Sequence, residues 1–343
     1  MNHTKQKLIL LVAAALTSSA LAAQTYKPTG SIPLGGNGGW DYLAVDTPAH
    51  RLYVSHAGEV EVVDLSSNKL VGKVSGMKRI HGIAFADDLN TGFISDGGSD
   101  EIVFFDLKTL RIKNKVKAGT NPDGIVYDAA SKRVFAFNGR SQNATAVNAV
   151  TGAVDATIAL GGKPEFPVSD GRGNVYDNIE DKSEIVQIDS KNLKVKAHWS
   201  VSPCESPSGL AIDLAGRRLF SVCDNKMMAV VNADSGKVVA TPAIGEGPDA
   251  AAFDPGTKLA FSSNGQDGTL TVVKQVSKDK YQVAATVPTT KGARTMALDT
   301  TTHKIYLSTA EYGPAPAATA ANAHPRPSIL PGTFKIMILS PQP

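Results

Sequence analysis

The chain has 343 residues, of which 42% are hydrophobic, 20% charged and 6% aromatic. This length can bury the core of one large domain or two ordinary ones, and the 31 glycines favour many short strands joined by tight turns over a helical bundle. The formal net charge is only +3, with no basic block or tail, which excludes the concentrated cationic face that a nucleic-acid partner requires.

The N-terminal residues have the pattern of a targeting segment. Lys5 and Lys7 precede an unbroken apolar run over residues 8–16, and Ala20-Leu21-Ala22 has the small-x-small pattern that a signal peptidase recognises. The apolar run is too short to span a bilayer, although an uncleaved anchor is the alternative. We therefore expect residues 1–22 to be a signal peptide and the mature protein to be periplasmic or secreted, without insertion into a membrane.

Seven short strand-like runs recur along the chain at intervals of 40 to 45 residues. They cover residues 42–46, 82–86, 124–128, 166–170, 209–213, 250–254 and 295–299. Each run is followed by a short turn, then by a second and a third β-rich run, a tight turn and a fourth run. Four strands in about forty residues correspond to one blade of a β-propeller.

The seventh repeat lacks its fourth strand, and the N-terminal part of the chain supplies a matching one. After the third run at residues 334–339 the chain ends, whereas Gly30–Gly36 parallels the fourth strand and following turn at residues 156–162. An N-terminal strand that completes the last blade would close the ring and remove open sheet edges, which argues against an open β-solenoid. We predict an all-β, seven-bladed β-propeller of four-stranded antiparallel blades, forming a single domain over residues 23–343.

One long stretch interrupts the repeat in the last blade. Residues 311–333 contain five prolines and many alanines, so they are suited neither to a strand nor to a helix. We expect a stiff loop, and we hypothesise that it covers one end of the central channel.

The repeat predicts two rings of side chains around that channel mouth. The residues that enter the first strands form the inner ring: Asp41, His81, Asp123, Glu165, Ser208, Asp249 and Arg294. The residues that leave the second strands form the outer ring: His56, Asp96, Asn138, Glu180, Asp224, Asn264 and Thr309. The candidate ligand-binding residues drawn from both rings are Asp41, His56, His81, Asp96, Asp123, Asn138, Glu165, Asp249, Asn264 and Arg294.

Four of the seven inner-ring positions are acidic, and mutual repulsion among crowded carboxylates disfavours their charged forms. A cation, a protonated ligand or Arg294 would relieve this repulsion. Oxygen-rich clusters suit Ca²⁺ or Mg²⁺, whereas the two histidines would suit Zn²⁺. The candidate metal ligands are Asp41, His81, Asp123, Glu165 and Asp249. The alternative is that Asp123 and Asp249, which both follow a proline, only bind neighbouring backbone N–H groups.

Cys204 and Cys223 both fall at the mouth end of the fifth repeat. In an exported chain we expect them to form a disulfide, with two free thiols or a Cys–His metal site as the alternatives. The sequence contains no Cys-x-x-Cys-His haem motif and no Gly-x-Ser-x-Gly nucleophile motif. We therefore assign no catalytic residue and no cofactor other than a candidate divalent cation.

The wording of the repeats resembles the YncE/YVTN-type family of secreted β-propellers. The resemblance is carried by residues 52–55, 121–125, 161–165, 247–249 and 305–308, which read Leu-Tyr-Val-Ser, Asn-Pro-Asp-Gly-Ile, Gly-Gly-Lys-Pro-Glu, Gly-Pro-Asp and Ile-Tyr-Leu-Ser. It covers roughly residues 25 to 340. The resemblance implies an exported protein that acts as a binding or interaction module, and it supplies no catalytic residues to carry over.

These patterns predict an exported, monomeric binding module. Its partner would be a small ligand or cation at the channel mouth, or a protein on the top face of the propeller. The alternative is a divalent-metal-dependent hydrolase or lyase, similar to propeller lactonases in which a channel-bound cation polarises the substrate carbonyl. That alternative rests on fold-level analogy, so the residues leave open whether the protein is an enzyme.

Overall fold

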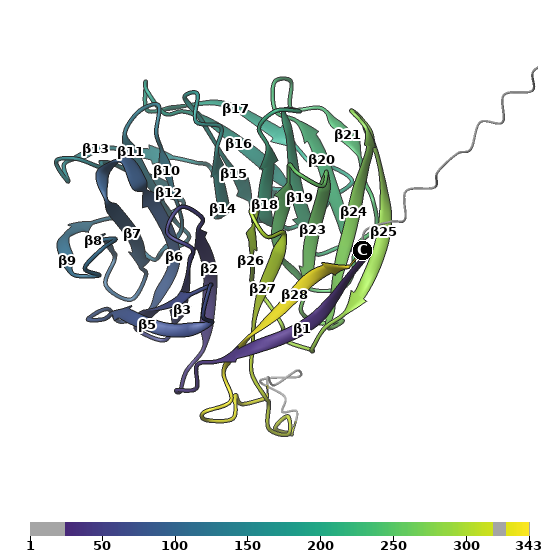
Figure 1. Ribbon diagram of the computed structural model, residues 1–343. Coiled ribbons are helices and arrows are strands. Elements are labelled where there is room, and N and C mark those ends of the chain that lie inside the picture. Colours follow the sequence, from purple (N-terminus) through teal and green to yellow (C-terminus); the bar gives the residue numbers. More distant parts are fainter. Residues whose placement is uncertain (1–24, 318–326, 343) are drawn as a thin grey trace, which may run out of the picture.

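The computed structural model describes residues 25–317 and 327–342. Seven four-stranded sheets stand around a common centre (Figure 1), and all their strand pairs are antiparallel. The predicted seven-bladed β-propeller is confirmed. The expected signal peptide lies outside the described residues.

Blades 1 to 3 follow one another along the chain, each running from its innermost to its outermost strand. Blade 1 consists of β2 (Trp40–Asp46), β3 (Arg51–His56), β4 (Glu59–Asp64) and β5 (Lys69–Val74). Blade 2 consists of β6 (Ile80–Ala86), β7 (Thr91–Asp96), β8 (Glu101–Asp106) and β9 (Ile112–Lys117), with the short 3₁₀ turn η1 (Asp87–Leu89) after β6. Blade 3 consists of β10 (Pro122–Asp128), β11 (Arg133–Asn138), β12 (Asn143–Asn148) and β13 (Val154–Ala159).

Blades 4 to 6 repeat the same order. Blade 4 consists of β14 (Pro164–Ser169), β15 (Asn174–Ile179), β16 (Glu184–Asp189) and β17 (Lys194–Ser200), with the 3₁₀ turn η2 (Glu180–Lys182) after β15. Blade 5 consists of β18 (Pro207–Asp213), β19 (Arg218–Cys223), β20 (Met227–Asn232) and β21 (Val238–Ala240). Blade 6 consists of β22 (Pro248–Asp254), β23 (Leu259–Asn264), β24 (Thr269–Ser277) and β25 (Lys280–Pro288). Among the described residues no helix is long and apolar enough to cross a membrane.

Blade 7 joins the two ends of the chain. It consists of β26 (Met296–Asp299), β27 (Lys304–Thr309), β28 (Lys335–Gln342) and, as its outermost strand, β1 (Thr25–Pro33). β1 pairs with β28 over its whole length, with Ile32 opposite Ile336, so the predicted ring closure is confirmed. The strand starts five residues before the expected Gly30, because the buried Tyr26 ring packs edge-on against Phe261 of blade 6, with 5.1 Å between the ring centroids.

The core of the protein consists of seven apolar clusters, each at an interface between neighbouring blades. In the cluster between blades 7 and 1, Ile32 and Ile336 from blade 7 pack with Leu52 from blade 1. The second and third strands are buried on both faces by the adjacent blades, as in β3, where Leu52–His56 are all buried. The outermost strands are largely exposed, as in β5. This arrangement explains the continuous apolar runs in the middle of each repeat.

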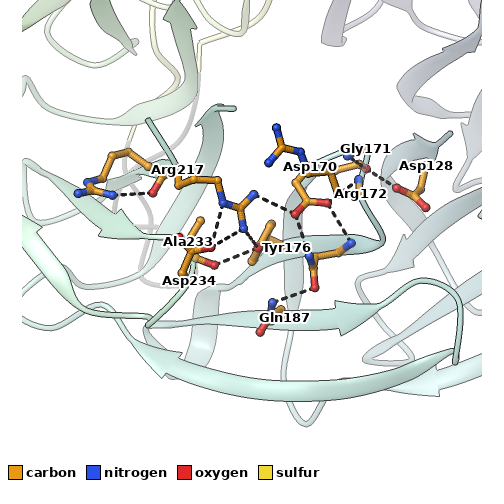
Figure 2. A network of polar contacts seen from close by, with 12 residues as sticks. Asp128, Asp170, Gly171, Arg172, Tyr176, Gln187, Arg217, Ala233 and Asp234 are labelled. Carbon is orange, nitrogen blue, oxygen red and sulfur yellow. Dashed lines mark hydrogen bonds and ion pairs between the residues drawn. The ribbon is translucent and has the colours of Figure 1, made fainter. Parts of the chain in front are cut away.

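A network of polar contacts joins blades 3, 4 and 5 (Figure 2). It lies opposite the inner ring, because Asp123 and Asp128 lie at opposite ends of β10. Asp128, at the end of β10, accepts hydrogen bonds from Ser169 and Ser190 of blade 4 at 2.6 and 2.7 Å. Arg217 of blade 5 contacts Asp170 of blade 4 at 3.0 Å and Asp234 at 2.8 Å. The Asp170 side chain is only 1% exposed, and charge-assisted hydrogen bonds of this kind fix the relative position of neighbouring blades.

We expect the Ile32→Ala substitution to lower the free energy of unfolding by about 2–5 kcal/mol, because it removes a side chain that is 2% exposed from the closure interface. Urea denaturation measures this change. Ser31→Ala is the matched control, since Ser31 lies in the same strand and is exposed; its effect should stay within about 0.5 kcal/mol. Equal effects of the two substitutions would contradict the proposed weight of the closure strand.

Candidate functional site

The inner-ring residues share one backbone feature that aims them at the channel. In blade 1, Trp40 pairs with His56 and the next register pair is Leu43 with Val54, so Asp41 lies in a β-bulge. The same shift recurs at the start of β6, β10, β14 and β18, and a shorter one at the start of β22. A bulge takes a residue out of the ladder and redirects its side chain, so six blades present their inner-ring residue in the same way.

Hydroxyl groups hold the bulged backbone from the neighbouring blade. Ser55 Oγ donates to the carbonyl oxygen of His81, and Ser95 Oγ donates to that of Asp123 at 2.5 Å. Between blades 7 and 1, Thr295 Oγ1 donates to the carbonyl oxygen of Asp41 at 2.6 Å. We did not predict these positioning residues, although a serine one position before the end of the second strand was a usable signal.

Three of the five candidate metal ligands lie together. One ligand atom each from Asp41, His81 and Asp123 lies within 4.8 Å of the other two. His81 Nδ1 lies 2.5 Å from Asp41 Oδ2 and 3.7 Å from Asp123 Oδ1. The three residues come from blades 1, 2 and 3, so only the folded ring assembles the group. We call this group the Asp–His–Asp cluster.

The His81 imidazole is fixed by its surroundings. It is 4% exposed, and its Nε2 atom has no hydrogen-bond partner among the described residues. The ring packs against the backbone of Gly97, where a Cβ atom would come within 2.8 Å of Nε2. Glycine is therefore required at position 97 for the histidine to occupy this place.

The other two candidate metal ligands are paired with cations of the chain. Lys163 Nζ contacts Glu165 at 2.6 Å and also contacts Glu180. Arg294 contacts Asp249 at 2.9 Å. The structure thus does not bring Glu165 and Asp249 into the Asp–His–Asp cluster, because each finds its counter-ion locally. Arg294 was expected to relieve the inner-ring carboxylates, whereas the Lys163 pair was not predicted, because the repeat aligns positions and not the directions of long side chains.

Burial and mutual repulsion shift the pKa values of these acids. Burial, with added repulsion from Asp41, raises the pKa of Asp123 to about 6 although His81 opposes the shift. Burial and the charge of Asp123 raise the pKa of Glu165 to about 8. Burial also raises the pKa of Asp177, which is fully buried beside Glu165 and has no hydrogen-bond partner for either oxygen among the described residues. The charged forms of these buried carboxyl groups are therefore disfavoured at the mouth.

Aromatic side chains narrow the channel next to these acids. The Tyr42 and Phe166 rings meet edge to face, with 5.1 Å between their centroids. A cavity of about 30 Å³ beside them is bounded also by Gly82 and Gly124, which is room for roughly one water molecule. Burial, with added repulsion from the inner-ring carboxylates, raises the pKa of Tyr42 well above its usual value.

The outer-ring candidates have partners inside their own blades. His56 faces Glu61 at 3.4 Å, Asp96 accepts a hydrogen bond from the backbone of Arg79 at 3.1 Å, and the Asn138 and Asn264 amides donate to Thr145 and Thr271 at 3.0 and 2.9 Å. All four are buried. The structure does not bring them to the Asp–His–Asp cluster, and their role in ligand binding stays a prediction.

Two outer-ring assignments differ by one position from the strand ends. β15 ends at Ile179 and β19 at Cys223, so Glu180 and Asp224 lie one residue beyond their strands. In blade 5 the position is taken by Cys223, whose disulfide to Cys204 is confirmed, with a Cα–Cα distance of 5.7 Å. Both cysteines are buried, which is typical of a structural disulfide.

The described ends of the long loop lie beside blade 1. Gly332 N donates to Gly36 O at 2.8 Å, and the Tyr312 and Trp40 rings are 6.4 Å apart. The Trp40 indole in turn donates to the carbonyl oxygen of Arg294. Residues 318–326 lie outside the described residues, so the covering of the mouth by this loop stays a prediction.

We expect the stability of the metal-free protein to fall as the pH rises from 5 to 9. A carboxyl group with a raised folded-state pKa contributes stability that is complete below its unfolded pKa of about 4.3 and is lost as the pH rises through the folded value, here about 8 for Glu165. Glu165→Gln should flatten this decline, and Lys163 keeps Glu180 as a partner. Urea titrations at several pH values measure the free energy of unfolding, and Glu205→Gln, at an exposed position, is the control. If the free energy of unfolding falls with pH as steeply in Glu165→Gln as in the wild type, Glu165 is not the cause of the decline.

Comparison with known proteins supports the fold. No protein-family model matches the chain, and no curated protein matches it. The chain is similar to the solved structure titled Kuenenia stuttgartiensis Hydrazine Synthase, with a TM-score of 0.67, 15% identity, and coverage of 77% of this chain and 91% of that one. It is also similar to U3-55K, with a TM-score of 0.74, 8% identity, and coverage of 90% and 97%. Similarity at these identities shows a shared β-propeller fold.

Proposed function

We propose that this protein is a binding module whose channel mouth takes a small cationic ligand. The observation that carries the proposal is the charge imbalance at the mouth. The carboxylates of Asp41 and Asp123 have only the His81 imidazole between them, while the nearby lysine and arginine are committed to other acids. A bound cation would relieve the repulsion between these two carboxylates and would stabilise their charged forms, which burial disfavours.

The rest of the molecule accords with an exported module. We propose that the chain belongs to the YncE/YVTN-type family of β-propellers, because its repeats carry the residue pattern of that family at equivalent positions in successive blades. The disulfide supports a periplasmic or secreted location, since disulfides persist in oxidising compartments. We propose a monomer that has no nucleic-acid partner.

We favour a binding function for the channel mouth over a catalytic one. A lactonase-like hydrolase would need room for a substrate carbonyl beside the bound cation. The cavity at the Tyr42–Phe166 pair is about 30 Å³, which suits one water better than an organic substrate. A small cation needs no such cavity.

Cations that bind at the mouth should raise the melting temperature, and the double substitution Asp41→Asn/Asp123→Asn should abolish that rise, because it removes both carboxylates of the Asp–His–Asp cluster. A thermal-shift panel of Zn²⁺, Mn²⁺, Ca²⁺, Mg²⁺, choline and spermidine on the mature protein measures this. The control is Glu184→Gln/Glu205→Gln, which removes two negative charges elsewhere on the surface. If no cation stabilises the wild type, or if the double variant keeps the whole shift, the proposed function is wrong.

A further inference from the structure

Resting on this proposed function, we infer that the cation is a single divalent transition-metal ion of the Zn²⁺ type, bound by the carboxylates of Asp41 and Asp123 and by Nδ1 of His81. Imidazole nitrogen together with carboxylate oxygen is a donor set that such ions accept. The three donors come from three consecutive blades, so the ion would tie blades 1, 2 and 3 together.

The spacing of the donor atoms needs little adjustment to hold an ion. The three atoms lie within 4.8 Å of one another, whereas donors about 2.1 Å from one tetrahedral ion stand roughly 3.4 Å apart. Asp123 Oδ1 is already 3.7 Å from His81 Nδ1, and Asp41 Oδ2 at 2.5 Å would retreat as the ion replaces its hydrogen bond. The side chains of Asp41 and Asp123 are 31% and 21% exposed, so both have freedom to move.

His81 is the fixed member of the site, because it is buried and packs against Gly97. Its side chain is 5% exposed and directs Nδ1 between the two carboxylates, while Nε2 has no partner among the described residues. When Nδ1 binds a metal, the proton resides on Nε2, and such N–H groups usually reach an acceptor in the next layer. The Asn121 side-chain oxygen borders the same space beside Gly97, within reach of a bridging water.

The donor set argues against two other occupants. Ca²⁺ takes six to eight oxygen ligands, but the nearest further carboxylates, Glu165 and Asp249, are held by Lys163 and Arg294. An organic cation would need a cavity of about its own volume, whereas the cavity beside the aromatic pair Tyr42 and Phe166 measures only about 30 Å³. Three protein donors leave an ion at least one open position, which is the coordination of a site that can bind a further small group.

Isothermal titration of Zn²⁺ into the untagged mature protein, and of Co²⁺ with its visible absorption spectrum, tests the site. We expect one ion per chain, tetrahedral Co²⁺ bands, and an affinity loss of at least about 100-fold in His81→Gln. Asp123→Asn should weaken binding similarly while preserving the fold, because it removes a carboxylate whose burial is unfavourable. His198→Gln is the control, since His198 lies in the exposed strand β17 of blade 4 and pairs only with Glu184 at 3.2 Å.

The outcomes separate this inference from the proposed function. If choline or spermidine raises the melting temperature in a manner that depends on Asp41 and Asp123 while Zn²⁺ and Co²⁺ do not bind, the metal inference is wrong and the proposed function stands. Zn²⁺ binding that His81→Gln leaves unchanged also overturns the inference. If no cation of either kind binds, both are wrong. Stoichiometric binding that is lost in both His81→Gln and Asp123→Asn, with folding shown by circular dichroism, supports the assigned ligands.

Discussion

The pairing of β1 with β28 is the constraint on which the rest of the structure depends. It joins residues about three hundred positions apart in the sequence, and it completes the seventh blade with strands from both ends of the chain, which closes the ring. Closure also sets the geometry of the mouth, because the inner strands can face one another only when every blade has a neighbour on both sides. The Thr295–Asp41 hydrogen bond between blades 7 and 1 exists only in the closed ring.

The same closure accounts for the unfavourable placement of charge at the mouth. Each blade alone would leave its inner-ring side chain in water, whereas the ring brings carboxylates from several blades into one partly buried region. The core clusters between blades and the buried polar network at the opposite end hold the ring in this arrangement. Stability generated at the interfaces thus offsets local repulsion, which is a common arrangement at functional sites.

The fold could be predicted because a repeat of about forty residues constrains every blade at once, and the missing fourth strand had a matching segment at residues 30–36. The convergence of Asp41, His81 and Asp123 followed from their equivalent positions. Arg294 could be predicted as a counter-ion of the inner ring. Its choice of Asp249 and the pairing of Lys163 with Glu165 could not, because both act through long side chains whose direction depends on rotamers rather than on the repeat. The outer ring was harder to predict, since a one-residue change at a strand end turns a side chain to the other face, as at Glu180 and Asp224. His56 and Asn264 do end their strands, but both are buried and paired within their own blades.

Sevenfold repetition and chemical asymmetry are therefore separate properties of this ring. The bulge recurs in six blades, but histidine occurs in it only at position 81, and only there do two neighbouring blades place a carboxylate beside an imidazole. On the far side of the mouth the same position carries Ser208 and the ion-paired Asp249, with Arg294 following. The β-bulge is nearly the same in six blades, and it fixes where each inner-ring side chain emerges. The residue type at that position differs from blade to blade, so the chemistry of the mouth is asymmetric.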